Sequence, residues 1–364
     1  MTDSAWRREL SRRAILKGAA AASGLAAASR VLPEREAHAA DVQSFIARPP
    51  DGFVPMAAPG RITRITAKGD LSAVMQKNQR WPKLEPARKL LDQALVRFTG
   101  ASSPVEAMKR FVHPSDRVAV KVNGIGAQTG YAFGTNYEVI LAVVETVMKV
   151  GVPPEKIMVF GQYPTYLSGC RINVRDWQLP EKVQTDTHNN VKMEMPKVTI
   201  YQGIQTQFCK AFTDATAVIN VALLKDHGIC GFTGALKNIT HGVSSNPHAF
   251  HAHQASPQIA LLYNHPVIRS RMRLHVTDGF RLMYDGGPLD RNRKAQILHG
   301  SVYVATDPVA LDTIGAKLLD EHCTENGLPT FKKGRREPRY IRTAAELGLG
   351  VHDLNAIRMQ TFEV

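Results

Sequence analysis

The chain has 364 residues, of which 44% are apolar and 21% are charged, a composition typical of a globular protein with a substantial core. This composition excludes a disordered or a fibrous chain. Lys and Arg outnumber Asp and Glu by 46 to 32, which gives a formal net charge of +14. Nucleic acid, an anionic membrane surface and an acidic ligand all suit such a charge, so charge alone does not choose among them.

Residues 1–39 predict an export signal. A twin arginine at Arg12 and Arg13 is followed by a short Ala-rich apolar run and by the small-residue cleavage sequence Ala37-His38-Ala39. This order resembles a signal read by the twin-arginine translocase, so we expect a folded mature chain in the periplasm or outside the cell. The apolar run is too short for a membrane span, and no later segment offers the ~18 apolar residues that a span needs.

The basic character of the chain does not come from the signal alone. Residues 1–39 contain 7 of the 46 Lys and Arg and 4 of the 32 Asp and Glu, so 39 and 28 remain, a net charge of +11. Residues 332–342, KKGRREPRYIR, hold much of this charge and are expected to be solvated or to meet an acidic surface. Because an exported protein seldom meets nucleic acid, we expect no nucleic-acid partner.

The twin-arginine route favours a metal or redox cofactor, because proteins that use it fold, and often acquire a cofactor, before export. The identity of such a cofactor stays open, with a divalent metal as one candidate. The cysteines Cys170, Cys209, Cys230 and Cys323 are widely spaced and contain no C-x-x-C pair, which argues against an iron–sulfur cluster. One or two disulfides are compatible with an oxidising compartment.

Along the mature chain, residues 40–61 are rich in Pro and Gly and predict an extended lead-in, and residues 62–364 predict a single α/β domain. The segment EPARKLLDQALVRFTG has apolar residues at helical spacing and predicts a helix that ends at Gly100. Ser103 before Pro104 predicts the start of a second helix, because serine is a good N-cap and proline a good first helical residue.

Short apolar runs separated by helical or long polar stretches predict a largely parallel sheet with helices on both faces. The predicted strands are 117–123, 156–161, 215–224, 272–278 and 301–305. Long Gly-rich loops are expected at the strand ends, where open α/β sheets bind ligands. The loop NGIGAQTGYAFGTN after the first strand lacks the glycine spacing of a dinucleotide-binding fingerprint, and it is either a ligand-binding loop or a flexible surface loop.

The segment LLKDHGICGFTGALKNITHG, which follows a buried strand, predicts the functional site. Lysines there supply positive charge and glycines let backbone N–H groups approach a ligand, so the segment resembles a cradle for an oxyanion or a carboxylate. Alternatively, its lysines pair with carboxylates and its asparagine caps a turn. The candidate residues are Lys225, His227 and Lys237 for catalysis and Lys121, Asn123, Gly231, Gly234 and Asn238 for ligand binding. Cys230, beside them, is expected to be a small buried residue rather than a nucleophile.

A histidine-rich stretch, THGVSSNPHAFHAH, comes next and predicts either a metal site or a solvated polar loop. Imidazole nitrogens spaced this closely can share a metal ion, although the pattern fits no standard zinc protease. The candidate metal ligands are His241, His248, His251, His253, Asp278 and Asp307, with Asp285 and Asp312 as further carboxylates that could orient them. Asp307 precedes Pro308, so it is equally expected to cap a helix.

Four motifs resemble the domain of unknown function 362 family. They are VAVKVNGIG, then AVINVALLKDHGICGFTGALKN, then VTDGF followed by DGGP, and finally VYVATDPVALD, in the expected order over residues 117–318. The resemblance implies an α/β fold but little chemistry, because the family has no assigned reaction. Some relatives carry ferredoxin-like cysteine modules, and this chain has none.

Two classes of function therefore stay open. The first is an exported metal- or redox-cofactor-dependent enzyme acting on an anionic small molecule, in which a lysine stabilises negative charge and His227 moves protons. The second is a periplasmic ligand- or metal-binding protein without catalysis, in which the same groups only hold a ligand.

Overall fold

The computed structural model describes residues 41–128 and 132–364, and Val42–Val364 form one compact unit. The predicted export signal and residues 129–131 of the glycine-rich loop lie outside the described residues. Within the described part, no helix is long and apolar enough to cross a membrane.

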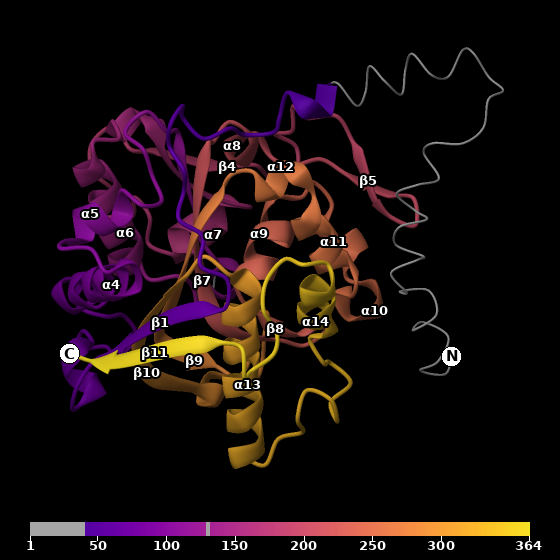
Figure 1. Ribbon diagram of the computed structural model, residues 1–364. Helices are drawn as coiled ribbons and strands as arrows, with labels where there is room; N and C mark the ends of the chain where they lie inside the picture. The colour runs from indigo at the N-terminus through magenta and orange to yellow at the C-terminus, as the bar shows by residue number, and fades with distance from the viewer. Residues whose placement is uncertain (1–40, 129–131) are drawn as a thin grey trace. The chain divides into compact units, whose positions relative to one another are not determined.

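The described residues contain a nine-stranded sheet whose main path runs in the order β11-β1-β10-β9-β7-β2-β3-β4, while β8 pairs with β7 alone (Figure 1). Two further strands form a separate hairpin. The strands are β1 (Arg61–Thr66), β2 (Val118–Lys121), β3 (Ile157–Gly161), β4 (Gln184–Thr187), β5 (Val198–Tyr201), β6 (Ile204–Thr206), β7 (Ala217–His227), β8 (Gly231–Thr233), β9 (Met272–Met283), β10 (Gln296–Ala305) and β11 (Arg358–Glu363).

The sheet is mostly parallel, as the sequence predicted. Strand β2 pairs in parallel with β3 and β7, β7 with β9, β3 with β4, and β1 with β11. The expectation for the segment 301–305 needs a correction, because β10 runs antiparallel to both β9 and β1. The reason is the short connection between Met283 and Gln296, which turns the chain back on itself instead of crossing over a face of the sheet.

Helices cover both faces of the sheet, with α4, α5 and α6 on one face and α9, α11, α13 and α14 on the other (Figure 1). The helices are α4 (Leu84–Thr99), α5 (Pro104–Met108), α6 (Tyr137–Val150), α7 (Pro164–Gly169), α8 (Lys210–Thr213), α9 (Ala235–Val243), α10 (Ala252–Ala255), α11 (Gln258–Asn264), α12 (Pro266–Arg269), α13 (Pro308–Glu325) and α14 (Arg339–Glu346).

Alternation along the strands divides the core between these two faces. Val118 and Val120 of β2 pack in the core beneath α4 and α6, whereas Ala119 between them packs in the core with α9 and α13. Successive side chains of a strand point to opposite faces, so a strand covered by helices on both sides is apolar at every position. This is why the predicted strands appear in the sequence as continuous apolar runs.

Three predicted helix boundaries are confirmed. Helix α4 ends at Gly100, which adopts a left-handed conformation with φ of 73°. The Ser103 hydroxyl accepts the N–H of Glu106 at the start of α5. Asp307 caps α13, with Pro308 as its first residue. All four cysteines are free and buried, so the disulfides that the sequence allowed are not formed.

Candidate functional site

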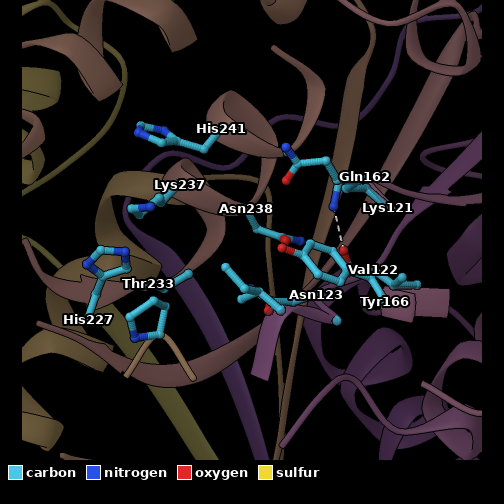
Figure 2. A pocket seen from close by; sticks show the side chains of 14 residues that line it. Lys121, Val122, Asn123, Gln162, Tyr166, His227, Thr233, Lys237, Asn238 and His241 are labelled. Carbon is cyan, nitrogen blue, oxygen red and sulfur yellow. Dashed lines mark hydrogen bonds between the residues drawn. The ribbon is translucent and has the colours of Figure 1, made fainter. Parts of the chain in front are cut away.

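One pocket lies at the carboxyl ends of the parallel strands β2, β3 and β7, and it encloses about 440 Å³ including the part open to solvent. This is the edge at which open α/β sheets bind ligands. The side chains of His227, Lys237 and His241 line one side and those of Lys121 and Gln162 the other (Figure 2). The full lining comprises Lys121, Val122, Asn123, Gly124, Ile125, Gln162, Tyr166, His227, Thr233, Lys237, Asn238, His241, Gly242 and Pro288.

Strand β7 continues through Lys225 to His227 instead of ending at residue 224. The chain then turns back into β8, which places Lys225 opposite Thr233. Lys225 and His227 are two residues apart on one strand, so both side chains lie on the same face. Lys225 is fully buried, and its Nζ donates to Asn123 Oδ1 at 3.0 Å and to the Pro288 carbonyl at 3.2 Å.

Helix α9 supplies Lys237, Asn238 and His241, and the i, i+4 spacing of Lys237 and His241 puts both on one face. The expectation that backbone N–H groups near Gly231 and Gly234 cradle a ligand needs a correction. The N–H groups of Ala235 and Leu236 already donate to the Asp312 carboxylate, at 2.6 and 3.0 Å.

The two glycines are explained by close packing instead, and neither lines the pocket. A Cβ at Gly234 would lie 2.2 Å from Asp312 Oδ1, and one at Gly231 would lie 2.2 Å from the Arg336 carbonyl oxygen. Gly231 also has a φ of 75°, which favours glycine.

Two buried lysines, Lys121 and Lys237, line the pocket, and a third, Lys225, donates to the lining residue Asn123. Lys121 is 3% exposed, and burial lowers its pKa to about 8. Burial also lowers the pKa of Lys237, and it lowers that of Lys225 well below the ordinary lysine range. The Lys121 Nζ donates to the Val122 carbonyl at 2.5 Å, as Figure 2 shows. Each ammonium group therefore pays a desolvation cost that a bound negative charge would offset.

No carboxylate lines the pocket, and among the described residues no salt bridge reaches any of the three lysines. The carboxylate nearest in sequence to these lysines is Asp226, between Lys225 and His227 on β7. Its side chain therefore points to the opposite face of the strand. It pairs with Arg336 and accepts the N–H of Gly287 at 2.9 Å. The positive charge of the pocket is thus left without an internal counter-ion in the described chain.

Three imidazoles adjoin the lysines and are held in their neutral forms. The ring of His251 stacks on His227 at 5.4 Å and meets His241 edge-on at 4.6 Å. Burial lowers the pKa of His251 to about 4 and the pKa values of His227 and His241 well below their ordinary range. The Lys237 Nζ lies 3.2 Å from His251 Nε2, while His251 Nδ1 lies 3.0 Å from the Pro247 carbonyl. Since a carbonyl only accepts, the His251 hydrogen is on Nδ1.

Two buried polar atoms of the pocket have no hydrogen-bond partner within the described residues. They are Nε2 of His241, in a residue that is 6% exposed, and Oγ1 of Thr233, in a residue that is 5% exposed. Leaving such a group unsatisfied costs about 1–3 kcal/mol. Both side chains line the pocket, so a ligand there could satisfy them.

The other predicted metal ligands are not brought into the pocket. His248 and His253 are exposed, and the Asp278 carboxylate accepts the backbone and side-chain N–H groups of Asn136. Asp307 accepts four backbone N–H groups, from Val309, Ala310, Gly60 and Val351. The two cap N–H groups donate to Asp307 Oδ1 and those of Gly60 and Val351 to Oδ2, so both oxygens are occupied and this residue fits the helix-cap interpretation. Among residues 41–128 and 132–364, no group of three or more His, Cys, Asp or Glu is placed to hold a metal ion.

The sequence analysis missed three residues that shape the site, Asn220, Thr233 and Gly242, and it named Asp312 only as a carboxylate that could orient metal ligands. Asn220 is a lone amide inside the apolar run AVINVALL, and it donates to the Ala235 carbonyl at 2.9 Å. A polar residue in a strand buried on both faces needs a hydrogen-bond partner, so the sequence alone could have marked this asparagine as part of a buried polar network. Gly242 lies directly against the Lys121 side chain: a Cβ at this position would be only 2.5 Å from Lys121 Cε.

Comparison with known proteins shows which family the chain represents. The model of the domain of unknown function DUF362 matches residues 118–317, more than half of the chain. The chain therefore belongs to this family, in agreement with the motifs seen in the sequence. No curated protein matches it.

Proposed function

We propose that the pocket binds a small anionic molecule and that the protein is an exported enzyme acting on it. The observation that carries the proposal is a pair of buried lysines, Lys121 and Lys237, in a pocket that no carboxylate of the described residues lines, with Lys225 behind Asn123. A bound anion would offset their desolvation and could satisfy the free atoms of His241 and Thr233.

Proton transfer is the chemistry that these groups support best. With a pKa of about 8, Lys121 loses and regains a proton close to physiological pH, which an ordinary lysine does not. A neutral His227 accepts the Ile229 N–H at Nδ1, at 3.2 Å, so its ring hydrogen is on Nε2. An amine that can act as a base and an imidazole that can donate a hydrogen bond thus line the same pocket. A protein that only binds the anion is the alternative.

The metal or redox cofactor expected from the sequence stays a prediction. The lysine charges beside His227, His241 and His251 oppose binding of a bare cation, and they lower the pKa values of these imidazoles further. We therefore place an anion, rather than a metal ion, at the centre of the proposed site.

The proposal is tested by calorimetric titration of the mature chain with acetate, glycolate and phosphate at constant ionic strength. At least one anion should bind with a defined stoichiometry. The Gly242→Ala variant should bind it about tenfold more weakly, because the new methyl group displaces the Lys121 ammonium. Its stability should be equal or higher, since alanine favours a helix over glycine by about 1 kcal/mol.

Absence of saturable binding of every anion to the folded wild-type chain contradicts the proposal. If Gly242→Ala binds the anion as tightly as the wild-type chain does, Lys121 is not part of the anion site. The matched control is Gly327→Ala, at a glycine with no heavy atom within 4 Å of the added Cβ. Because Gly327 has a positive φ, alanine there should lower the stability of the fold, while anion binding should stay unchanged.

Export through the twin-arginine translocase is part of the same proposal. Mass spectrometry of protein recovered from the native host's periplasm should show an N-terminus at or near Ala40. Changing Arg12 and Arg13 to lysine should leave the full precursor inside the cell. A full-length product in the cytoplasm of the unmodified host would refute export.

A further inference from the structure

The hydrogen-bond network behind the pocket points to a narrower class of ligand, and this inference rests on the proposed anion site. We propose that the bound anion carries a hydroxyl group next to its charged group and that Asn238 recognises the hydroxyl hydrogen. The proposed ligands are thus hydroxy acids or similarly hydroxylated anions, in preference to the matching anions without the hydroxyl.

The argument starts from Asn220, whose amide orientation is fixed by a backbone carbonyl. Its Nδ2 lies 2.9 Å from the Ala235 carbonyl oxygen, which can only accept a hydrogen bond. The Asn220 Oδ1 therefore faces Asn238 and accepts from its Nδ2 at 2.7 Å. The reverse orientation of Asn220 would set its oxygen against the Ala235 oxygen, so the amide does not flip.

Buried groups extend this network into the core. The Asn220 Nδ2 also lies 3.0 Å from His275 Nδ1, and His275 Nε2 lies 3.1 Å from the Tyr263 hydroxyl. Burial lowers the pKa of His275 to about 3, so the ring is neutral, accepts at Nδ1 and donates at Nε2. Asn220 and His275 are at most 1% exposed. The network therefore holds each amide in one orientation.

As a consequence, Asn238 offers the pocket an acceptor. Its Nδ2 donates to Asn220 and, at 3.4 Å, to the Val221 carbonyl, which uses both hydrogens. Its Oδ1 makes no hydrogen bond to any described residue, and the side chain lines the pocket between Lys237 and Asn123 (Figure 2). An ionised carboxylate or phosphate oxygen cannot donate to this oxygen, whereas a hydroxyl can.

The amide of Asn123 has the opposite orientation and offers the pocket donors. Lys225 donates to Asn123 Oδ1 at 3.0 Å, which leaves the Asn123 Nδ2 hydrogens for another partner. The donors of the lysines, Asn123 and Thr233 suit the acceptor oxygens of an anion. Asn238 Oδ1 is an acceptor beside these donors, and a ligand that covers it without donating a hydrogen bond would leave it unpaired, which is costly.

The experiment compares pairs of anions that differ by one hydroxyl, glycolate against acetate and malate against succinate, by calorimetric titration of the mature chain. Wild-type protein should bind the hydroxylated member about tenfold more tightly in at least one pair. In Asn238→Ala the ratio of the two affinities should fall to about twofold or less. The affinity for the anion without the hydroxyl should stay almost unchanged. Asn238→Leu fills a similar volume without an acceptor, so it should lose the preference for the hydroxylated member as Asn238→Ala does.

The control is Asn123→Ala, which removes a donor and should weaken both members of a pair equally. Equal binding of both members to wild-type protein overturns the hydroxyl inference and leaves the anion site intact. No binding of any of these anions to folded protein overturns the hydroxyl inference, and if phosphate does not bind either, it overturns the proposed function as well. If Asn238→Ala does not fold, Asn238→Leu decides, since a retained preference for the hydroxylated member there also contradicts the inference.

Discussion

Replacing Lys237 with methionine is expected to weaken binding of the anion by about 10- to 100-fold. A hydrogen bond to a charged group contributes about 1.5–3 kcal/mol, and 1.4 kcal/mol corresponds to a factor of ten. Lys237 is 7% exposed, and its described contact is with the neutral His251 ring. Calorimetric titration of the best-bound anion measures the loss.

The same substitution should leave the free energy of unfolding unchanged or raise it. Methionine resembles the lysine side chain in volume but has no charge to desolvate, and burial disfavours the Lys237 ammonium. A surface lysine is the matched control: Lys317, on the exposed side of α13, pairs with Glu321, and Lys317→Met removes the same charge outside the pocket. Full anion affinity in Lys237→Met, or an equal loss in Lys317→Met, would contradict the site.

The second large effect is a loss of stability on acidification from pH 6.5 to 4. Burial lowers the pKa of several imidazoles, so that the folded state binds fewer protons than the unfolded chain in this range. They are His188, His251 and His265, with pKa values of about 4, and His275 and His299, with pKa values of about 3. Stability therefore rises with pH between these values and 6.5 and is lost as the pH falls.

Two carboxyl groups act in the opposite direction. Burial raises the pKa of Asp278 to about 6 and that of Asp312 to about 7, so acidification removes the cost of burying their charges. Each pKa unit corresponds to about 1.4 kcal/mol, and the five imidazoles together outweigh the two carboxyls. The free energy of unfolding, measured in urea, should fall by about 3 kcal/mol or more between pH 7 and 4.5.

The His299→Gln variant is the control for this pH dependence. His299 stacks on Tyr303 away from the anion pocket, so glutamine there should reduce the slope while anion binding stays unchanged. Stability that is flat or increases from pH 7 to 4.5 would show that these imidazoles are not held neutral by burial.

The sequence predicted those parts of the fold that depend on local patterns. Continuous apolar runs indicated the strands, and Gly100, Ser103 and Asp307 marked helix ends that the structure confirms. The antiparallel pairing of β10 was missed because strand direction depends on the path of the connection, which an apolar run does not record.

For the candidate site, the sequence predicted the lysine- and histidine-bearing segments but not their partners. Lys225 and His227 share a face because their spacing is that of a strand, and this could be inferred directly. That Asp312 caps α9 from 76 residues away could not, because it depends on how α13 packs. The same holds for Asn220 and His275, which are 55 residues apart and meet only across neighbouring strands.

A crystal structure of the mature chain with glycolate tests the central claim most directly. The account predicts the carboxylate within hydrogen-bond distance of Lys121 or Lys237 and of Nε2 of His241 or Oγ1 of Thr233. It also predicts the hydroxyl within about 3 Å of Asn238 Oδ1. An ordered ligand elsewhere, or an empty pocket at a glycolate concentration that saturates binding in solution, would contradict it.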